Sequence, residues 1–146
     1  MKVMRQPLCG TFNPSIDAKG RMSFPSKLRD ILGGEFYLCL SHDKRYIAAF
    51  SIEDFDEYSK KLFDLPGAAG EQIRRDVLAG AEKQTPDAQG RIFISQKLRD
   101  KAGITGDVTV IGNYNRAEIW ASDRLEASKT EVDEAEIKAL LATISL

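Results

Sequence analysis

Two short segments carry the residues best suited to bind an anion. Residues 17–21 read Asp-Ala-Lys-Gly-Arg and residues 87–91 read Asp-Ala-Gln-Gly-Arg, at an offset of 70 residues. Arginine presents a planar fork of N–H donors, which matches a phosphate group or the O6 and N7 atoms of guanine. Asp at the first position and Gly at the fourth are typical of a type I turn, in which the carboxylate accepts backbone N–H bonds. Each segment is therefore predicted to be a turn that presents one arginine, Arg21 or Arg91, to a polyanion.

The same spacing also has a purely structural interpretation. Asp17 and Arg21, like Asp87 and Arg91, could form an ion pair that only stiffens the turn. Short motifs are weak evidence for function by themselves, so the spacing alone leaves both interpretations open. The repetition of the motif favours function, and both interpretations hold if each Asp orients the Arg that contacts the ligand.

The repeat extends well beyond the two motifs. Residues 27–30 read Lys-Leu-Arg-Asp and recur at 97–100, so eight of the fourteen positions in 17–30 and 87–100 are identical. Unrelated segments of ordinary composition would share about one position. The chain is therefore predicted to contain two related halves, 10–65 and 81–130, joined by a linker helix at 66–80 and followed by a tail at 131–146.

Each motif is predicted to lead into a strand and a short helix. Residues 21–24 alternate as expected for a strand with one buried face, whereas residues 91–94 alternate less cleanly and could be covered on both faces. Ser26 and Ser95 are the expected N-caps of the two short helices. A glycine, Gly33 or Gly103, is expected to end each helix.

A hairpin and a second helix are expected to follow in each half. Residues 36–40 are predicted to pair with 46–50, and residues 108–111 with 117–120. Ser51 and Ser122 are placed to begin the next helices. Apolar residues at helical spacing predict an amphipathic helix in the tail; they are Ile137, Leu140, Leu141 and Ile144. The expected fold class is α+β, with tandem duplicated β-hairpin repeats and short flanking helices.

Positive charge is local rather than spread over the chain. The 21 Lys and Arg residues are balanced by 22 Asp and Glu residues, which excludes a uniformly basic nucleic-acid-binding chain. Residues 17–30 and 87–101 each carry a net charge of +2, whereas the predicted helix at 51–64 carries −3. A polyanion is therefore expected to be attracted to the two turns.

Lys19 lies at the tip of the first turn. The short helices carry four more basic residues, whose commoner role is ion pairing, for example with Asp30 and Asp100: Lys27, Arg29, Lys97 and Arg99.

Several classes of protein find no support in the sequence. The longest apolar runs have five residues, far fewer than the roughly twenty that span a bilayer. No apolar stretch typical of a secretory signal follows Lys2 and Arg5, and both Cys9 and Cys39 are expected to be reduced cytoplasmic thiols. The single histidine, His42, gives neither zinc-ligand spacing nor a catalytic triad. We therefore expect no catalytic residues, metal, cofactor, small-molecule substrate or membrane partner.

Taken together, the motifs resemble those of the MraZ family of bacterial transcriptional regulators, which is related to the AbrB and SpoVT swapped-hairpin DNA-binding domains. The resemblance covers about residues 10–130 and rests on the paired Asp-x-x-x-Arg motifs, each followed by Leu-Arg. Gly-Ala-Glu at 80–82 and Glu-Ile-Trp at 118–120 also resemble the family. The resemblance implies an AbrB-like β-barrel core and a ring-shaped homo-oligomer. It further implies binding to short direct repeats in promoter DNA of cell-division and cell-wall genes, in the cytoplasm and at the nucleoid.

The resemblance also assigns roles to residues. Within the family the motif is tied to DNA binding, and here the matching residues are Asp17, Arg21, Asp87 and Arg91. Gln89 replaces the lysine of the first copy, so the second turn is expected to hold phosphate less firmly, and Ser95 stands where proline is expected. The expected DNA contacts are therefore Asp17, Lys19, Arg21, Asp87, Gln89 and Arg91, with Lys27, Arg29, Lys97 and Arg99 as secondary contacts.

Three functions can be compared on these grounds. The leading hypothesis is a sequence-specific regulator that binds double-stranded DNA and has no catalytic activity. An alternative is an antitoxin-type interaction module that binds a partner protein as well as its own promoter, and a tail that orders on that partner would favour it. An enzyme is the third hypothesis, and the sequence offers no set of residues that supports it.

Overall fold

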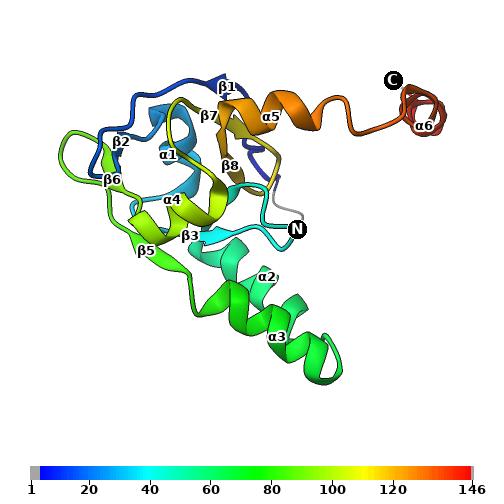
Figure 1. Ribbon diagram of the computed structural model, residues 1–146, viewed down its shortest axis with the longest axis horizontal. Coiled ribbons are helices and arrows are strands. Elements are labelled where there is room, and N and C mark those ends of the chain that lie inside the picture. Colours follow the sequence, from blue (N-terminus) through cyan, green and yellow to red (C-terminus); the bar gives the residue numbers. More distant parts are fainter. Residues whose placement is uncertain (1–3, 146) are drawn as a thin grey trace.

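The two halves of the chain build one antiparallel sheet between them (Figure 1). The computed structural model describes residues 4–145. Within these residues a six-stranded sheet has the order β1-β7-β8-β4-β3-β5, and β2 and β6 form a separate two-stranded ribbon. The strands of the sheet are β1 (Thr11–Phe12), β3 (Phe36–Leu40), β4 (Ile47–Ser51), β5 (Glu82–Gln84), β7 (Val108–Gly112) and β8 (Ala117–Ala121), and those of the ribbon are β2 (Arg21–Ser23) and β6 (Arg91–Phe93). The helices are α1 (Ser26–Leu32), α2 (Ile52–Phe63), α3 (Gly67–Leu78), α4 (Gln96–Ala102), α5 (Ser122–Ser128) and α6 (Glu134–Leu141). The expected α+β class, with a duplicated hairpin, is confirmed.

Strands are exchanged between the two halves. β1 of the first half pairs with β7 of the second, whereas β5 of the second half pairs with β3 of the first. β4 and β8 pair in the middle of the sheet, with Ile47 opposite Ile119 and Ala49 opposite Ala117. The two expected hairpins, β3 with β4 and β7 with β8, are also present. Neither half therefore completes its own sheet, and the halves share one main core.

Two apolar cores explain why the first hairpin consists of uninterrupted apolar runs. Successive residues of a strand point to opposite faces of the sheet. Leu38 and Ala49 pack in the larger core, to which β2, β6, α1 and α4 also contribute. Cys39 and Ala48 point the other way, into the smaller core beneath α2 and α3. Burial raises the pKa of the Cys39 thiol to about 12, so this cysteine is a small apolar core residue at neutral pH.

Helices α2 and α3 cover the outer face of the first hairpin (Figure 1). Ser51 begins α2 as expected, because its Oγ accepts a hydrogen bond from the backbone N–H of Asp54 at 3.1 Å. Tyr37 stacks on Phe55 with 4.4 Å between ring centroids, and Phe50 stacks on Tyr58 with 5.1 Å. These aromatic contacts hold the helix pair on the sheet, on the far side from the larger core.

The two short helices begin differently although their positions correspond. Ser95 caps α4, since its Oγ accepts a hydrogen bond from the backbone N–H of Leu98 at 3.2 Å. The expectation that Ser26 caps α1 is wrong, because Pro25 occupies the cap position and Ser26 is already the first helical residue. Proline fixes the entry angle of the chain but has no side-chain acceptor for the first N–H groups. Gly33 and Gly103 end the helices as expected.

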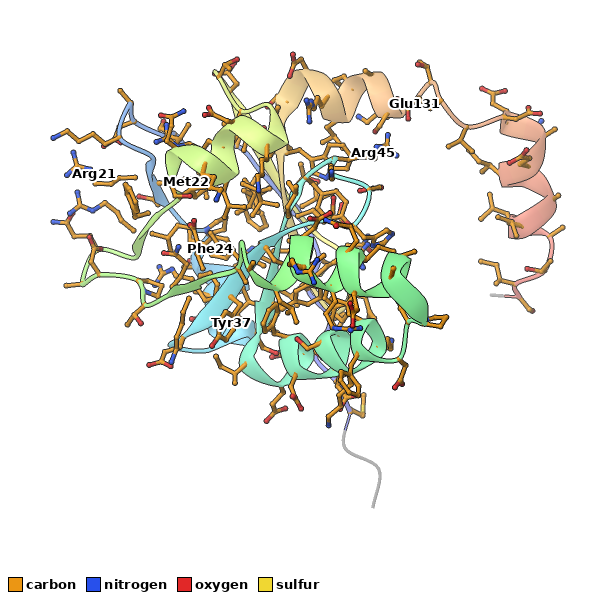
Figure 2. All side chains as sticks on the ribbon, turned by 60° about the horizontal axis from the view of Figure 1, so that its bottom comes forward. Arg21, Met22, Phe24, Tyr37, Arg45 and Glu131 are labelled. Carbon is orange, nitrogen blue, oxygen red and sulfur yellow. The ribbon has the colours of Figure 1, made fainter. Side chains whose placement is uncertain are left out.

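The C-terminal segment leaves the body of the molecule. Figure 1 shows α6 apart from the sheet and the other helices. Its apolar side chains are exposed, with Leu140 at 70% and Leu141 at 58%. Before α6, Glu131 accepts a hydrogen bond from Arg45 Nη2 at 2.6 Å (Figure 2). Both side chains are well exposed, so this ion pair stabilises the segment only weakly. Among the described residues, no helix combines the length and the apolar character that crossing a membrane requires.

Candidate nucleic-acid interface

The first motif folds into a turn in which both oxygens of one carboxylate are used. Asp17 Oδ1 accepts hydrogen bonds from the backbone N–H groups of Lys19 and Arg21, both at 2.9 Å. Arg21 Nε donates to Asp17 Oδ2 at 2.9 Å, and Gly20 N donates to Asp17 O at 3.0 Å. The pKa of Asp17 is lowered, chiefly by the backbone N–H of Arg21, so the carboxylate stays charged. The turn engages Arg21 through Nε, while the outer edge of the guanidinium faces solvent.

The second motif repeats this geometry. Asp87 Oδ1 accepts hydrogen bonds from the backbone N–H groups of Gln89 and Arg91, and Arg91 Nε donates to Asp87 Oδ2, all at 2.9 Å. The pKa of Asp87 is lowered for the same reason, with the backbone N–H of Arg91 as the largest cause. The ion pairs that the spacing suggested are therefore present. They are compatible with ligand binding, because the side chains of Arg21 and Arg91 remain 50% and 43% exposed.

The two motifs meet because β2 and β6 pair with each other. Arg21 lies opposite Phe93, Met22 opposite Ile92, and Ser23 opposite Arg91. Residues opposite each other on paired strands point to the same face. Met22 and Ile92 are buried, so the other face of the ribbon presents both arginines to solvent. Figure 2 shows Arg21 at the outer edge of the molecule, with Met22 and Phe24 nearer its centre. Arg21 and Arg91 thus lie two residues apart along the ribbon, or about 7 Å.

Arg29 and Arg99 support the turns from behind. Arg29 Nε donates to Phe24 O and Arg99 Nε donates to Ile94 O, both at 3.0 Å. Arg99 Nη1 also reaches Ala18 O in the turn of the other half, at 3.3 Å. Within residues 4–145 neither arginine pairs with Asp30 or Asp100, so the expected ion pairs are wrong. The guanidinium groups instead donate hydrogen bonds to the carbonyl oxygens of the residues that directly follow β2 and β6.

The contact between helix and turn is reciprocal. A Cβ atom on Gly20 would lie 2.8 Å from Arg99 Nε, and one on Gly90 would lie 2.7 Å from Arg29 Nη2. Each short helix therefore packs its arginine under the turn of the opposite half. The repeat held a signal for this contact, because glycine and arginine both recur at the offset of 70 residues. Sequence reasoning interpreted the glycines only as turn residues.

The remaining candidate residues are exposed, and in the described part of the chain their side chains have no hydrogen-bond or ion-pair partner. Lys19 and Gln89 lie at equivalent exposed positions on the turn tips, and Lys27 and Lys97 are exposed on α1 and α4. Arg99 is buried and Arg29 is half-buried, so Lys27 and Lys97 are more accessible than the two arginines. No three His, Cys, Asp or Glu side chains among residues 4–145 come together to hold a metal ion.

Sequence reasoning missed one residue of the ribbon, Phe93, and one residue of β5 that holds it, Gln84. Phe93 is 53% exposed, so the expectation that residues 91–94 are covered on both faces is wrong. The buried Gln84 holds the backbone of Phe93, since Gln84 Nε2 donates to Phe93 O at 2.7 Å and Phe93 N donates to Gln84 Oε1 at 3.2 Å. A glutamine at the end of a three-residue strand gives no local sign of such a contact.

Comparison with known proteins agrees with the internal repeat. A family model described as "MraZ protein, putative antitoxin-like" matches residues 8–76 and again residues 77–144. Proteins named "Transcriptional regulator MraZ" are similar over most of their length. The protein from Saccharopolyspora erythraea is 37% identical, and the similar region covers 86% of this chain and 88% of the relative. The protein from Bifidobacterium longum is 36% identical, and the similar region covers 87% of this chain and 85% of the relative. The protein from Clavibacter michiganensis subsp. michiganensis is 40% identical, and the similar region covers 76% of this chain and 78% of the relative. With two matches of the family model and such relatives, this chain belongs to the MraZ family.

Proposed function

We propose that this protein is a transcriptional regulator that binds double-stranded DNA sequence-specifically, at short direct repeats in the promoter of cell-division and cell-wall genes. The observation that carries the proposal is the pair of identically built turns that present Arg21 and Arg91 from one face of the β2–β6 ribbon. The names of the relatives support a role in transcription. The protein would act in the cytoplasm, at the nucleoid.

A two-stranded ribbon is a suitable element for reading DNA. Such ribbons fit the major groove, which is about 12 Å wide, and present side chains from one face to base edges. The proposed contacts are guanidinium groups on guanine or phosphate, with Asp17 and Asp87 fixing their orientation through Nε. This arrangement leaves the Nη groups, which make the bidentate contact, directed at the ligand.

The proposed mechanism needs several copies of the chain. Each ribbon is flanked by only two turns of modest charge, and non-specific attraction of this size is weak in physiological salt. Several ribbons on one ring-shaped homo-oligomer would each bind one repeat and raise the effective local concentration of the others. The exposed apolar residues in and beside α6 support self-association, because soluble proteins seldom expose a contiguous group of large apolar side chains without a partner.

Light scattering tests both parts of the proposal. The full chain alone is expected to have a mass that is a high multiple of 16.2 kDa, and a duplex with several direct repeats is expected to bind more tightly than a duplex with one. A scrambled duplex of the same composition is the control for sequence preference. A monomeric mass, or equal affinity for the scrambled duplex, would contradict the proposal.

Exchange of the turn-tip residues tests the phosphate contacts. Lys19→Gln gives the first turn the residue of the second, and Gln89→Lys does the reverse. We expect Lys19→Gln to weaken binding to all duplexes and to reduce the slope of log K against log salt by about one, as for one lost phosphate contact. Gln89→Lys should increase that slope by a similar amount. Unchanged slopes in both variants would place the turn tips away from the DNA backbone.

An antitoxin-type interaction module is the second candidate, and the exposed face of α6 is the observation that favours it. The variant Leu140→Asp with Leu141→Asp separates the two uses of this helix. If α6 joins copies of this chain, the variant should have a lower mass than the wild type. If the variant keeps its mass and its affinity for DNA, α6 takes part in neither self-association nor DNA binding, and its exposed face would be available to a different partner protein.

A further inference from the structure

Phe93 is a large apolar residue on the solvent-exposed face of the ribbon. Along β6 and the residue after it, buried and exposed positions alternate regularly, with Ile92 and Ile94 inside and Arg91 and Phe93 outside. A large apolar side chain that is 53% exposed leaves about half of its surface in water and gains only part of the stabilisation that full burial would give. The equivalent position of the first half is Ser23, which is polar, so the structure of the repeat does not require an aromatic ring there.

The location of Phe93 connects it to the motif arginines. It lies directly opposite Arg21 and two residues beyond Arg91 on the same exposed face. Backbone hydrogen bonds from Phe24 N to Gly90 O and from Ile94 N to Gly20 O extend the ladder at both ends. Alternation along an antiparallel ladder then puts Arg21 and Phe93 in a non-hydrogen-bonded pair, where side chains approach most closely.

The backbone of Phe93 is also held in place from the other side. Its N–H and C=O point away from β2, and the carboxamide of Gln84 bonds to both. Gln84 is itself 8% exposed and belongs to β5, the edge strand of the main sheet. The phenyl ring is therefore carried by a fixed strand and lies beside the positions of Arg21 and Arg91, on the face that the proposed function directs into a DNA groove.

We infer that Phe93 is a specificity-determining residue that recognises the methyl group of a thymine in the major groove; this inference rests on the proposed function. Thymine is the base whose edge in that groove carries an apolar group, and phenylalanine is among the side chains that contact it. The guanidinium groups on either side bind guanine or phosphate and fix the register of the ring. Ser23, at the equivalent place of the first half, lacks the apolar surface for this contact.

The test removes the contact between the phenyl ring and the thymine methyl group twice, once by changing the DNA and once by changing the protein. Full-length protein selects duplexes from a random-sequence pool, and each thymine of the selected site is then replaced singly by uracil, which lacks only the methyl group. For the wild type, one replacement should weaken binding about fourfold, as expected for one methyl group removed from apolar contact. Phe93→Ser should bind the thymine duplex about as weakly as the wild type binds that uracil duplex. It should also be indifferent to the replacement.

Phe63→Ser is the matched control, because Phe63 is 72% exposed on α2 and lies outside the ribbon. It should keep the full response to uracil, and thermal unfolding should show that both variants remain folded. The inference is overturned if Phe93→Ser responds to uracil as the wild type does. It is equally overturned if no uracil replacement affects the wild type although Phe93→Ser binds more weakly, which would indicate a wedge between bases. Failure to select any sequence would instead contradict the proposed function itself.

Discussion

Charge reversal of both motif arginines, Arg21→Glu with Arg91→Glu, is expected to lower the affinity for a selected duplex by at least about thirtyfold. Each specific arginine contact contributes about 1–3 kcal/mol, and two are lost. The fold should survive, because Asp17 and Asp87 keep their bonds to the backbone N–H groups of the turns. Gel retardation with the selected duplex measures the affinity, and circular dichroism with light scattering checks fold and mass.

The control for this variant must carry the same change in net charge. Lys61→Glu with Arg75→Glu does so on exposed positions of α2 and α3, which lie away from the ribbon in Figure 1. We expect this control to weaken binding only slightly, through the overall field of the protein. Equal losses in the two double variants would show that general charge, rather than the two turns, determines DNA binding.

Gly20→Ala is expected to destabilise the protein by about 3 kcal/mol, which corresponds to a fall in Tm of about 6–12 °C. The added Cβ would lie 2.2 Å from the carbonyl oxygen of Ile94, which belongs to the opposite half. Gly20 also has a φ of 91°, a region that alanine adopts only with strain. Ile94 N donates to Gly20 O, so the substitution acts on the bond that ends the β2–β6 ladder. Thermal or urea unfolding measures the effect.

Gly34→Ala is the matched substitution for this experiment. A Cβ at Gly34 meets no atom within 4 Å, and its φ is not positive. Replacing such a glycine reduces the freedom of the unfolded chain, so the variant should be as stable as the wild type or slightly more stable. A similar loss of stability in both variants would mean that the close packing at Gly20 is unimportant.

The turns could be predicted from the sequence because their bonds are local. Every hydrogen bond to Asp17 within its turn comes from a residue at most four positions away, and the same is true of Asp87. The hairpins and the Ser51 cap are local in the same sense. Residue type and spacing determine such elements, and the order of these elements along the chain was correct.

The exchange of strands could not be predicted in this way. The pairing of Met22 with Ile92 depends on which surfaces remain uncovered after the hairpins have formed, and nothing near either residue encodes the partner. The partners of Arg29 and Arg99 were not predictable for the same reason. The charge pattern suggested ion pairs with neighbouring aspartates, whereas in the folded chain both side chains donate hydrogen bonds to backbone carbonyl oxygens. Phe93 was misjudged because the patterning rule takes every apolar residue of a strand to be buried.

Under the proposed function, the exchange of strands between the halves has a consequence for the kind of DNA sequence that the protein would bind. Two identical half-length chains with the same exchanged strands would form a two-fold symmetric pair, and such a pair matches a palindrome. Here one polypeptide contains both halves, so equivalent positions can differ: serine at position 23 corresponds to phenylalanine at position 93, and lysine at position 19 corresponds to glutamine at position 89. The ribbon therefore has a polarity. In the proposed homo-oligomer, copies arranged head to tail with the same polarity would match repeats that all run in one direction, and inverted sites would leave every second copy in the wrong orientation.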